Sequence, residues 1–399
     1  MKNAKRLLAL AAAGLMAVGM LAGCGGSSSS GASAEGASSD ELVWVIGCSG
    51  PLTGDAAAYG NDVVHGAELA AKEINEAGGI NGYQIKYIYG DDEHDTEKAI
   101  NAYNTMKDDG MQIFLGCTTT APTVAVAAET LNDNMFQLTP SGSALDCIAN
   151  DNCFAVCFND PQQGAKSAEY ISTHFPDAAI ATIYDSSTAY SAGIEATFEA
   201  EAANLGLNVV SKEAFTGDTK TDLSAQIQKA KDAGADLVFL PIYYDTAATI
   251  LTQANNMGYA PAFFGCDGMD GILGVENFDT SLAEGLMLLT PFAADSTDDL
   301  TVNFVKNFQE AYGKVPNQFG ADAYDGMYAI KAALEDAKIT PEASVSDICE
   351  ALKTSMFNIT VEGLTGTVTW KADAANLGEP DKTPKAVRIE NGAYVSIED

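Results

Sequence analysis

The sequence predicts an α/β protein made of two units in tandem, each with a parallel sheet covered by helices on both faces. Short apolar runs alternate with segments of helical periodicity along most of the chain, and the alternation occurs in two series. Turn signals containing glycine follow the helical segments of the second series, at 205–206, 233–234 and 257–258. The chain has 399 residues, which is too long for one hydrophobic core and indicates two domains.

The elements can be placed in order along the chain. In the first series the expected strands are 42–48, 85–89, 113–116 and 136–139, and the expected helices are 57–76, 96–108 and 123–132. In the second series the strands are 180–184, 207–211, 237–242 and 263–265, and the helices are 189–204, 223–232 and 246–257. The tail returns to helices at 300–312, 323–337 and 345–354, and ends in strand-like segments at 366–370 and 386–389.

The N-terminus has the features of a lipoprotein leader. A basic start precedes an apolar run over 7–22, which ends in Leu-Ala-Gly-Cys at Cys24. The alternative is an ordinary signal peptide followed by a chance cysteine. We expect a lipoprotein signal peptide over 1–23, lipidation of Cys24 and a flexible Gly/Ser/Ala-rich tether over 24–40. A lipid and a tether would hold the folded part at a membrane surface, outside the cytoplasm, on the cell surface or in the periplasm.

The charge balance excludes one class of partner. The formal net charge is −34, and Arg388 is the one arginine beyond the leader. Because nucleic-acid binding requires lysine and arginine to neutralise phosphates, we expect no nucleic-acid partner. The negative charge indicates a solvated surface.

The cysteines suggest one local crosslink. Of the eight cysteines, Cys147 and Cys153 lie close together in a polar segment, so we expect a disulfide between them. No C-x-x-C motif occurs, which argues against a zinc ribbon or a thioredoxin-type pair. No spacing of histidine and cysteine supports a metal site, and we expect no cofactor.

Hydroxyl groups follow neighbouring strands of the first unit. One such stretch, QLTPSGSALD at 137–146, places Ser141 and Ser143 where a strand turns toward a helix, and a second is the run 118–120. In open parallel sheets, ligands bind beyond the carboxyl ends of the strands. Hydroxyls and backbone N–H groups at helix starts can hold a small carboxylate without arginine. The alternative is that each hydroxyl is an ordinary helix cap.

Acids and aromatic residues follow the strands of the second unit. Asp185 with Tyr190, Tyr243 with Asp245, and Asp267 occupy these positions. Carboxylates pair with an ammonium group, and ring faces add cation–π attraction. The alternative is that the acids are solvated loop residues. The first unit would favour an anionic group and the second a cationic group. If the two units face each other, the site suits a zwitterion such as an α-amino acid.

Several motifs together resemble the leucine/isoleucine/valine-binding protein family, the type I solute-binding proteins of branched-chain amino acid ABC transporters. They are the Cys24 motif, SGP at 49–51 with YG at 59–60, GAELA at 66–70, IN at 74–75 with GGING at 78–82, DD at 91–92 and TP at 139–140. The resemblance implies an α/β fold of two Rossmann-like lobes with parallel sheets joined by a three-stranded hinge, which close on the ligand. It implies that lobe 1 comprises 42–160 plus 290–372, and lobe 2 comprises 161–289 plus 373–399.

The resemblance also implies residue roles. Thr118, with Thr119 as a near alternative, Ser141 and Ser143 would hold the ligand carboxylate. Asp267 would hold the ammonium, where the family often has Glu. The implied ligand-binding residues are therefore Tyr59, Thr118, Thr119, Ser141, Ser143, Tyr190, Tyr243 and Asp267. The ligand side chain would lie in an apolar pocket formed by Tyr59, Leu52, Cys48, Tyr190, Tyr243 and Met269. The sequence departs from the family at His94, which replaces the disulfide partner of Cys117 in some members.

These observations predict a binding protein without catalytic activity. We expect a monomeric substrate-binding lipoprotein of an ABC importer that captures a small amino acid, with a branched-chain one favoured, and delivers it to the permease. A sensory or receptor-presenting protein for another small carboxylate is the alternative. A serine hydrolase using Ser141 or Ser143 is the third hypothesis. It is disfavoured because His94 is the one histidine near a strand end and no G-x-S-x-G motif occurs.

Overall fold

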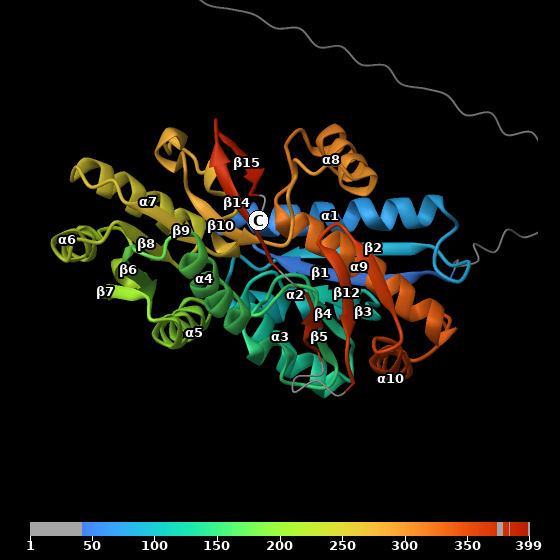
Figure 1. Ribbon diagram of the computed structural model, residues 1–399. Helices are drawn as coiled ribbons and strands as arrows, with labels where there is room; N and C mark the ends of the chain where they lie inside the picture. Colours follow the sequence, from blue (N-terminus) through green and yellow to red (C-terminus); the bar gives the residue numbers. More distant parts are fainter. Residues whose placement is uncertain (1–41, 373–377, 383, 398–399) are drawn as a thin grey trace, which may run out of the picture. The chain divides into compact units, whose positions relative to one another are not determined.

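The computed structural model describes residues 42–372, 378–382 and 384–397, and these residues form three β-sheets with their covering helices (Figure 1). The expected signal peptide, Cys24 and the tether lie outside the described residues. None of the helices in the described ranges is long and apolar enough to cross a membrane.

The first sheet has five parallel strands in the order β2-β1-β3-β4-β5. They are β1 (Trp44–Gly50), β2 (Ile85–Asp91), β3 (Ile113–Gly116), β4 (Gln137–Thr139) and β5 (Cys153–Ala155), connected by α1 (Ala57–Glu76), α2 (Thr96–Asp108), α3 (Thr120–Asp133) and the short η1 (Leu145–Ile148). Ile46 of β1 packs in the core that includes α1, whereas Val45 packs against the cluster that includes α2. Helices therefore cover both faces, as the long apolar strands require.

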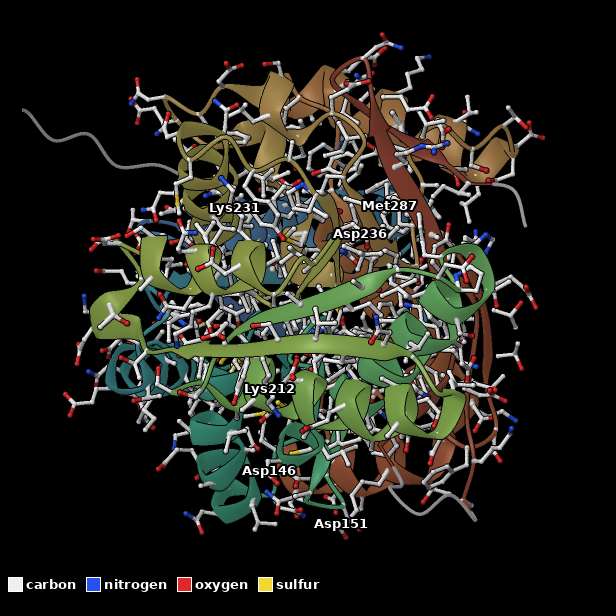
Figure 2. The ribbon with its side chains drawn as sticks, turned by 60° about the vertical axis from the view of Figure 1, so that its left-hand side comes forward. Asp146, Asp151, Lys212, Lys231, Asp236 and Met287 are labelled. Atoms are coloured by element: carbon white, nitrogen blue, oxygen red, sulfur yellow. The ribbon has the colours of Figure 1, made fainter. Side chains whose placement is uncertain are left out.

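The second sheet has seven strands in the order β15-β14-β10-β9-β8-β6-β7, and β14 and β15 are antiparallel additions to a parallel core. The strands are β6 (Ala179–Asp185), β7 (Asn208–Phe215), β8 (Leu237–Leu240), β9 (Ala262–Gly265), β10 (Met287–Thr290), β14 (Lys385–Glu390) and β15 (Ala393–Ser396), and the helices are α4 (Asp160–His174), α5 (Ala189–Leu205), α6 (Ser224–Asp232) and α7 (Tyr244–Asn256). Figure 2 shows Lys212, which lies on the edge strand β7. Its ion pair with Glu199 keeps this edge charged, which discourages pairing with another sheet.

The segment after the second sheet returns to the helices of the first. It forms α8 (Asp299–Tyr312), α9 (Gln318–Ala337), α10 (Val345–Ser355) and the antiparallel third sheet of β11 (Thr360–Gly363), β12 (Gly366–Trp370) and β13 (Pro380–Asp381). α9 packs along α1 so closely that a Cβ on Gly66 would lie 2.0 Å from the Gly320 carbonyl oxygen. We call the first and third sheets with α1–α3 and α8–α10 lobe 1, and the second sheet with α4–α7 lobe 2. The prediction of two α/β units with parallel sheets is confirmed.

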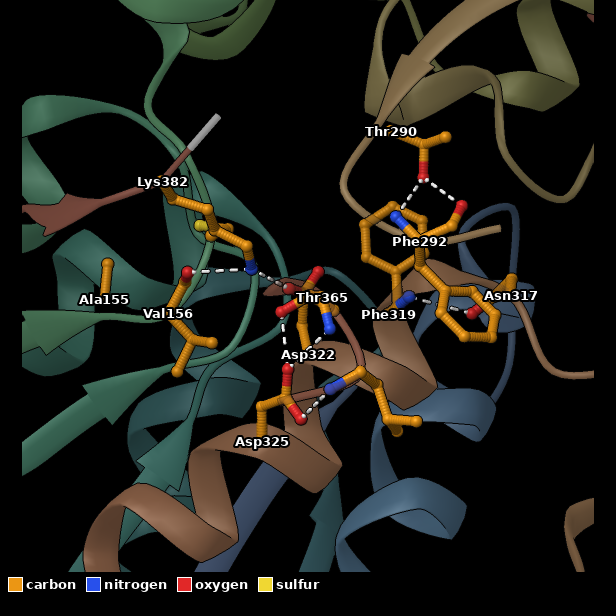
Figure 3. Close-up of polar contacts among 12 residues, drawn as sticks. Ala155, Val156, Thr290, Phe292, Asn317, Phe319, Asp322, Asp325, Thr365 and Lys382 are labelled. Atoms are coloured by element: carbon orange, nitrogen blue, oxygen red, sulfur yellow. Dashed lines mark hydrogen bonds and ion pairs between the residues drawn. The ribbon is translucent and has the colours of Figure 1, made fainter. Parts of the chain in front are cut away.

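The chain passes between the lobes at three places: after β5, after β10, and between β13 and β14. Figure 3 shows residues of all three crossings. Lys382 of the third crossing donates to the Val156 carbonyl oxygen of the first at 3.1 Å and pairs with Asp322 of α9 at 2.7 Å. Lys382 and Asp322 are almost completely buried. In the second crossing, Thr290 and Phe292 exchange two hydrogen bonds.

Two helices begin three or more residues earlier than expected, and several elements were not predicted: helix α4 and strands β5, β10, β11, β13 and β15. α3 begins at Thr120 and α9 at Gln318. Asn317 caps α9, because its side chain accepts hydrogen bonds from the backbone N–H groups of Phe319 and Gly320 at 3.1 and 3.3 Å. Of the strands that were not predicted, β5 is three residues long, too short for a periodicity signal.

The predicted disulfide between Cys147 and Cys153 is wrong, because both are free thiols. The Cys147 sulfur donates toward the Thr120 carbonyl oxygen at 3.8 Å, and the Cys153 sulfur lies 3.9 Å from the Thr130 hydroxyl. β5 pairs with β4 and fixes Cys153 in the sheet, whereas Cys147 lies on η1 against α3. The segment looks polar in sequence, but it folds both thiols into the core.

Candidate ligand-binding site

The turns that follow β3 and β4 lie against each other and bring the predicted hydroxyls together. The Ser141 hydroxyl donates to the Thr118 carbonyl oxygen at 2.6 Å, and the Thr118 hydroxyl donates to the Ser49 carbonyl oxygen at 3.4 Å. The Thr139 hydroxyl accepts the Gly142 N–H at 2.8 Å and holds the turn in place. Thr118 and Ser141 are buried. Neighbouring parallel strands thus produce the cluster that the strand-end rule predicts.

Ser143 connects this turn to the first residue of α4. The Asp160 N–H donates to the Ser143 carbonyl oxygen at 2.9 Å. The Asp160 side chain is buried, and the Ser143 side chain is its hydrogen-bonding neighbour. Burial raises the pKa of Asp160 well above its usual value, and the Ser143 side chain opposes that shift. Asp160 was missed by sequence reasoning because it follows β5, the strand that was also missed.

Asp267 lies in a short 3-10 helix, η3 (Asp267–Met269), directly after β9. One of its carboxyl oxygens accepts the Tyr190 hydroxyl at 2.6 Å, and its N–H donates to the Gln163 side chain at 3.2 Å. Burial raises the pKa of Asp267 to about 6, and the Tyr190 hydrogen bond opposes the shift. Gln163 and Asp160 both lie in the first turn of α4, so the loop that carries Asp267 and the turn that carries Ser143 contact the same helix start.

Aromatic rings from both lobes form one wall of the site. The ring of Tyr243 lies 4.8 Å from that of Tyr190 and 5.4 Å from that of Tyr59. Tyr59, on α1, donates its hydroxyl to the Gly268 carbonyl oxygen, and its ring packs 4.3 Å from that of Phe319. Tyr59 therefore connects lobe 1 to the loop that carries Asp267. Phe319 was missed because the sequence placed its helix start five residues too late.

A cavity of about 430 Å³ adjoins this wall. Tyr190 and Tyr243 line it, together with polar residues from both lobes. Lys220 spans its edge, pairing with Asp55 of lobe 1 at 2.8 Å and with Asp245 of lobe 2 at 3.1 Å. The remaining lining residues are Gly54, Ala56, Glu93, His94, Asp185, Ser187, Thr188, Ser191, Phe215, Gly217, Ile242 and Thr246.

The cavity differs from the apolar pocket that was expected. Of the six expected residues, Tyr190 and Tyr243 line it. The Cys48 thiol instead faces Tyr87 of β2, and Met269 packs against Gly265. The cavity is also not lined by Thr118, Ser141, Ser143 or Asp267.

Thr119 takes a different position from its neighbour Thr118. Its hydroxyl lies 2.8 Å from a ring nitrogen of His94. The His94 ring is 5.7 Å from that of Tyr243. Thr119 is thus at the edge toward the cavity, while Thr118 contacts Ser141.

Comparisons with known proteins agree with this architecture. A family model described as periplasmic binding protein matches residues 43–391. A Leu/Ile/Val-binding protein homolog of Brucella melitensis is 28% identical over 341 residues, which cover 84% of this chain and 89% of that relative. The structure of a branched-chain amino acid transporter substrate-binding protein from Streptococcus pneumoniae in complex with isoleucine has a TM-score of 0.79 and 26% identity, and the match covers 89% of this chain and 98% of that one. A leucine-binding protein structure from Thermotoga maritima has the same TM-score and coverage at 23% identity. The chain therefore belongs to the periplasmic binding protein family.

Proposed function

We propose that this protein is an extracytoplasmic substrate-binding lipoprotein of an ABC importer. It captures a small amino acid between its lobes and delivers it to the membrane permease. A branched-chain amino acid is the favoured ligand, because the relatives include a Leu/Ile/Val-binding protein homolog and a protein with bound isoleucine. It acts as a monomer and performs no catalysis.

One observation supports the amino acid assignment: a buried hydroxyl-rich turn follows β4 of lobe 1, a buried carboxyl group follows β9 of lobe 2, and both segments contact the start of α4. Ser141 and Ser143, with Thr118, supply hydroxyl and N–H donors for the ligand carboxylate. Asp267, oriented by Tyr190, pairs with the ligand ammonium. The remaining predicted residues, Tyr59, Tyr243 and Thr119, border the ligand side chain.

The anchor and the lobe boundaries belong to the same proposal. Cys24 carries the lipid, residues 1–23 are removed, and 24–40 tether the lobes to the membrane. The expected lobe boundaries are 42–160 plus 290–372 and 161–289 plus 373–399. The crossings after β5 and β10 support the first two boundaries, whereas the pairing of β13 with β12 moves the third from 372 to the segment between β13 and β14. Loss of membrane association and of labelled palmitate in a Cys24→Ala variant tests the anchor, and retention of both would exclude it.

A thermal-shift panel tests the ligand class. The twenty amino acids are compared with isocaproate and isoamylamine, which have the leucine side chain but lack the ammonium and the carboxylate, respectively. A ligand at 100 times its dissociation constant should stabilise the protein by roughly 2.7 kcal/mol. We expect leucine, isoleucine or valine to shift the melting temperature and the two analogues to have little effect. The polar lining of the cavity makes the polar amino acids essential members of the panel.

Two results would contradict the proposal. If none of the twenty amino acids stabilises the protein, the amino acid assignment is wrong. If isocaproate stabilises it as strongly as leucine, the site holds a carboxylate without an ammonium, and the small-carboxylate alternative replaces the proposal.

A further inference from the structure

The main chain of Asp267 is held from both lobes. Its N–H donates to the Gln163 side chain of α4, in lobe 2, at 3.2 Å. Its carbonyl oxygen accepts a hydrogen bond from the Gln318 side-chain amide of α9, in lobe 1, at 3.0 Å. Asp267, Gln163 and Gln318 are all buried. The residue that the proposed function assigns to the ligand ammonium is therefore also a point of contact between the lobes.

Gln318 makes a second contact with the same loop of lobe 2, through its own main chain. Its N–H, at the first position of α9, donates to the Asp270 carboxyl group at 2.8 Å. The N–H groups in the first turn of a helix have no partner within the helix, so the buried Asp270 side chain satisfies one of them from the other lobe. Gln318 thus holds both Asp267 and Asp270, the two ends of the loop 267–270.

The start of α9 is itself fixed to α1 of lobe 1. The Asn317 N–H donates to the Asp62 carboxyl group at 2.9 Å, and the Asn317 side-chain amide donates to the Ala58 carbonyl oxygen at 3.1 Å. Asp62 is buried on α1. Because these contacts lie within lobe 1, Gln318 is held in place by lobe 1 and moves with it.

The loop 267–270 is held on the other side by lobe 2. The Asp267 carboxyl group accepts the Tyr190 hydroxyl of α5 at 2.6 Å. The Gly271 N–H, directly after the loop, donates to the Tyr394 hydroxyl of β15 at 3.0 Å. A separation of the lobes would therefore break the two hydrogen bonds of Gln318 and leave the contacts within each lobe intact.

We propose that Gln318 is a positioning residue that couples closure of the lobes to ammonium binding at Asp267. In the closed form its side-chain amide fixes the main chain from which the Asp267 carboxyl group projects, and in the open form water replaces it. The inference rests on the proposed function, because it requires a ligand ammonium at Asp267. The coupling is reciprocal: a ligand that orders Asp267 favours closure, and closure favours the ordered Asp267.

Replacing Gln318 with methionine tests this role. Methionine has a similar length and volume but cannot donate to the Asp267 carbonyl oxygen, while the main-chain N–H can still reach Asp270. We expect calorimetry to show leucine binding about 10-fold more weakly, because the closed form then buries an unsatisfied carbonyl group. If another amino acid of the thermal-shift panel binds in place of leucine, it serves as the probe.

The kinetics separate positioning from general damage to the site. The open form, which meets the ligand, lacks the Gln318 hydrogen bonds, whereas the closed form needs them to stay closed. In stopped-flow measurements of tyrosine fluorescence we therefore expect the dissociation rate constant of Gln318→Met to rise by about 10-fold and the association rate constant to stay within about twofold of wild type.

Ligand-free stability gives the second readout, and two more variants complete the set. We expect urea unfolding without ligand to give Gln318→Met the same free energy of unfolding as wild type, because water satisfies both groups in the open form. Gln318→Glu also lacks the amide donor and should weaken leucine binding at least as much. Gln309→Met makes the same substitution at an exposed position of α8 in lobe 1 and should change neither binding nor stability.

The outcomes distinguish this inference from the proposed function. Leucine affinity within about threefold of wild type in both Gln318 variants would overturn the inference and leave the amino acid function intact. A ligand-free stability that falls as much as the binding free energy, or failure of both variants to fold, would also overturn it, because Gln318 would then be needed whether or not the lobes close. A loss of affinity through slower association would contradict it as well. Absence of binding by every amino acid in the wild-type protein would overturn the proposed function, and with it the inference.

Discussion

Replacing Asp267 with asparagine should change ligand affinity and protein stability in opposite directions. Asparagine keeps the shape of the side chain and an oxygen that can accept the Tyr190 hydroxyl. It removes the charge that the proposed function assigns to the ligand ammonium. Leaving a buried charge without its partner typically costs about 3–5 kcal/mol. Leucine should therefore bind Asp267→Asn about 100-fold to several thousand-fold more weakly.

The effect on the free protein follows from the pKa of Asp267. Burial raises it to about 6, from an ordinary value near 3.9 in an unfolded chain. Below pH 4 the carboxyl is protonated in both states and causes no penalty. Between about pH 4 and pH 6 the unfolded chain ionises this carboxyl while the folded protein keeps its proton, so the folded state loses up to about 3 kcal/mol of stability, and the full penalty is present at pH 7. Asp267→Asn should thus be more stable than wild type at pH 7, and the gain should disappear toward pH 4.

Two measurements check both halves of this prediction. Calorimetry gives the leucine affinity, and urea unfolding without ligand at pH 4 and pH 7 gives the stability. Asp218→Asn, an exposed acid of the same lobe, is the matched control and should change neither. Leucine affinity within a factor of about three of wild type in Asp267→Asn would refute the role of this carboxylate. A loss of stability at pH 7 would refute the argument from burial.

Three further predictions concern the turn, the crossings and the thiols. Ser143→Ala should weaken leucine binding about 10-fold by calorimetry, because a hydrogen bond to a charged group contributes about 1.5 kcal/mol or more. Lys382→Met should lower the free energy of unfolding by about 3–5 kcal/mol in urea at pH 7, because it leaves Asp322 buried and unpaired. The double variant with Asp322→Leu should recover most of that loss. Reductant should leave the melting temperature unchanged, because Cys147 and Cys153 are free.

Each of these has an outcome that contradicts it. Unchanged affinity in Ser143→Ala would remove its hydroxyl from the carboxylate subsite. A Lys382→Met protein as stable as wild type would mean that the buried pair with Asp322 is not required at the crossing. A lower melting temperature in reductant would indicate a disulfide.

Much of the candidate site could be predicted because it depends on local pattern. Apolar runs and helical periodicity place the strand ends, and parallel strands bring those ends to one edge of a sheet. Ser141 and Asp267 were found in this way. Their contacts with Thr118 and Tyr190 join residues that follow different strands of one sheet, so sheet order alone suffices to bring them together.

Asp160, Phe319 and Lys382 could not be predicted in the same way. Asp160 is buried between Ser143 of the turn after β4 and Gly193 of α5, segments that are far apart in the sequence. Phe319 reaches Tyr59 because α9 packs on α1, far away in the sequence. Nothing in the sequence distinguishes Lys382 from a surface lysine. It is buried because the third crossing packs against Val156 of the first crossing and against Asp322 of α9.

The two α/β units, the strand ends and the residue types on each side of the site can be read from the sequence, because they follow from periodicity and composition along short segments. Three features arise only from tertiary packing: Cys147 and Cys153 stay free, polar residues of separate segments line the cavity beside Tyr190 and Tyr243, and Asp160 is buried beside Ser143. These features depend on the distance and direction between side chains of separate segments, and only packing sets that geometry.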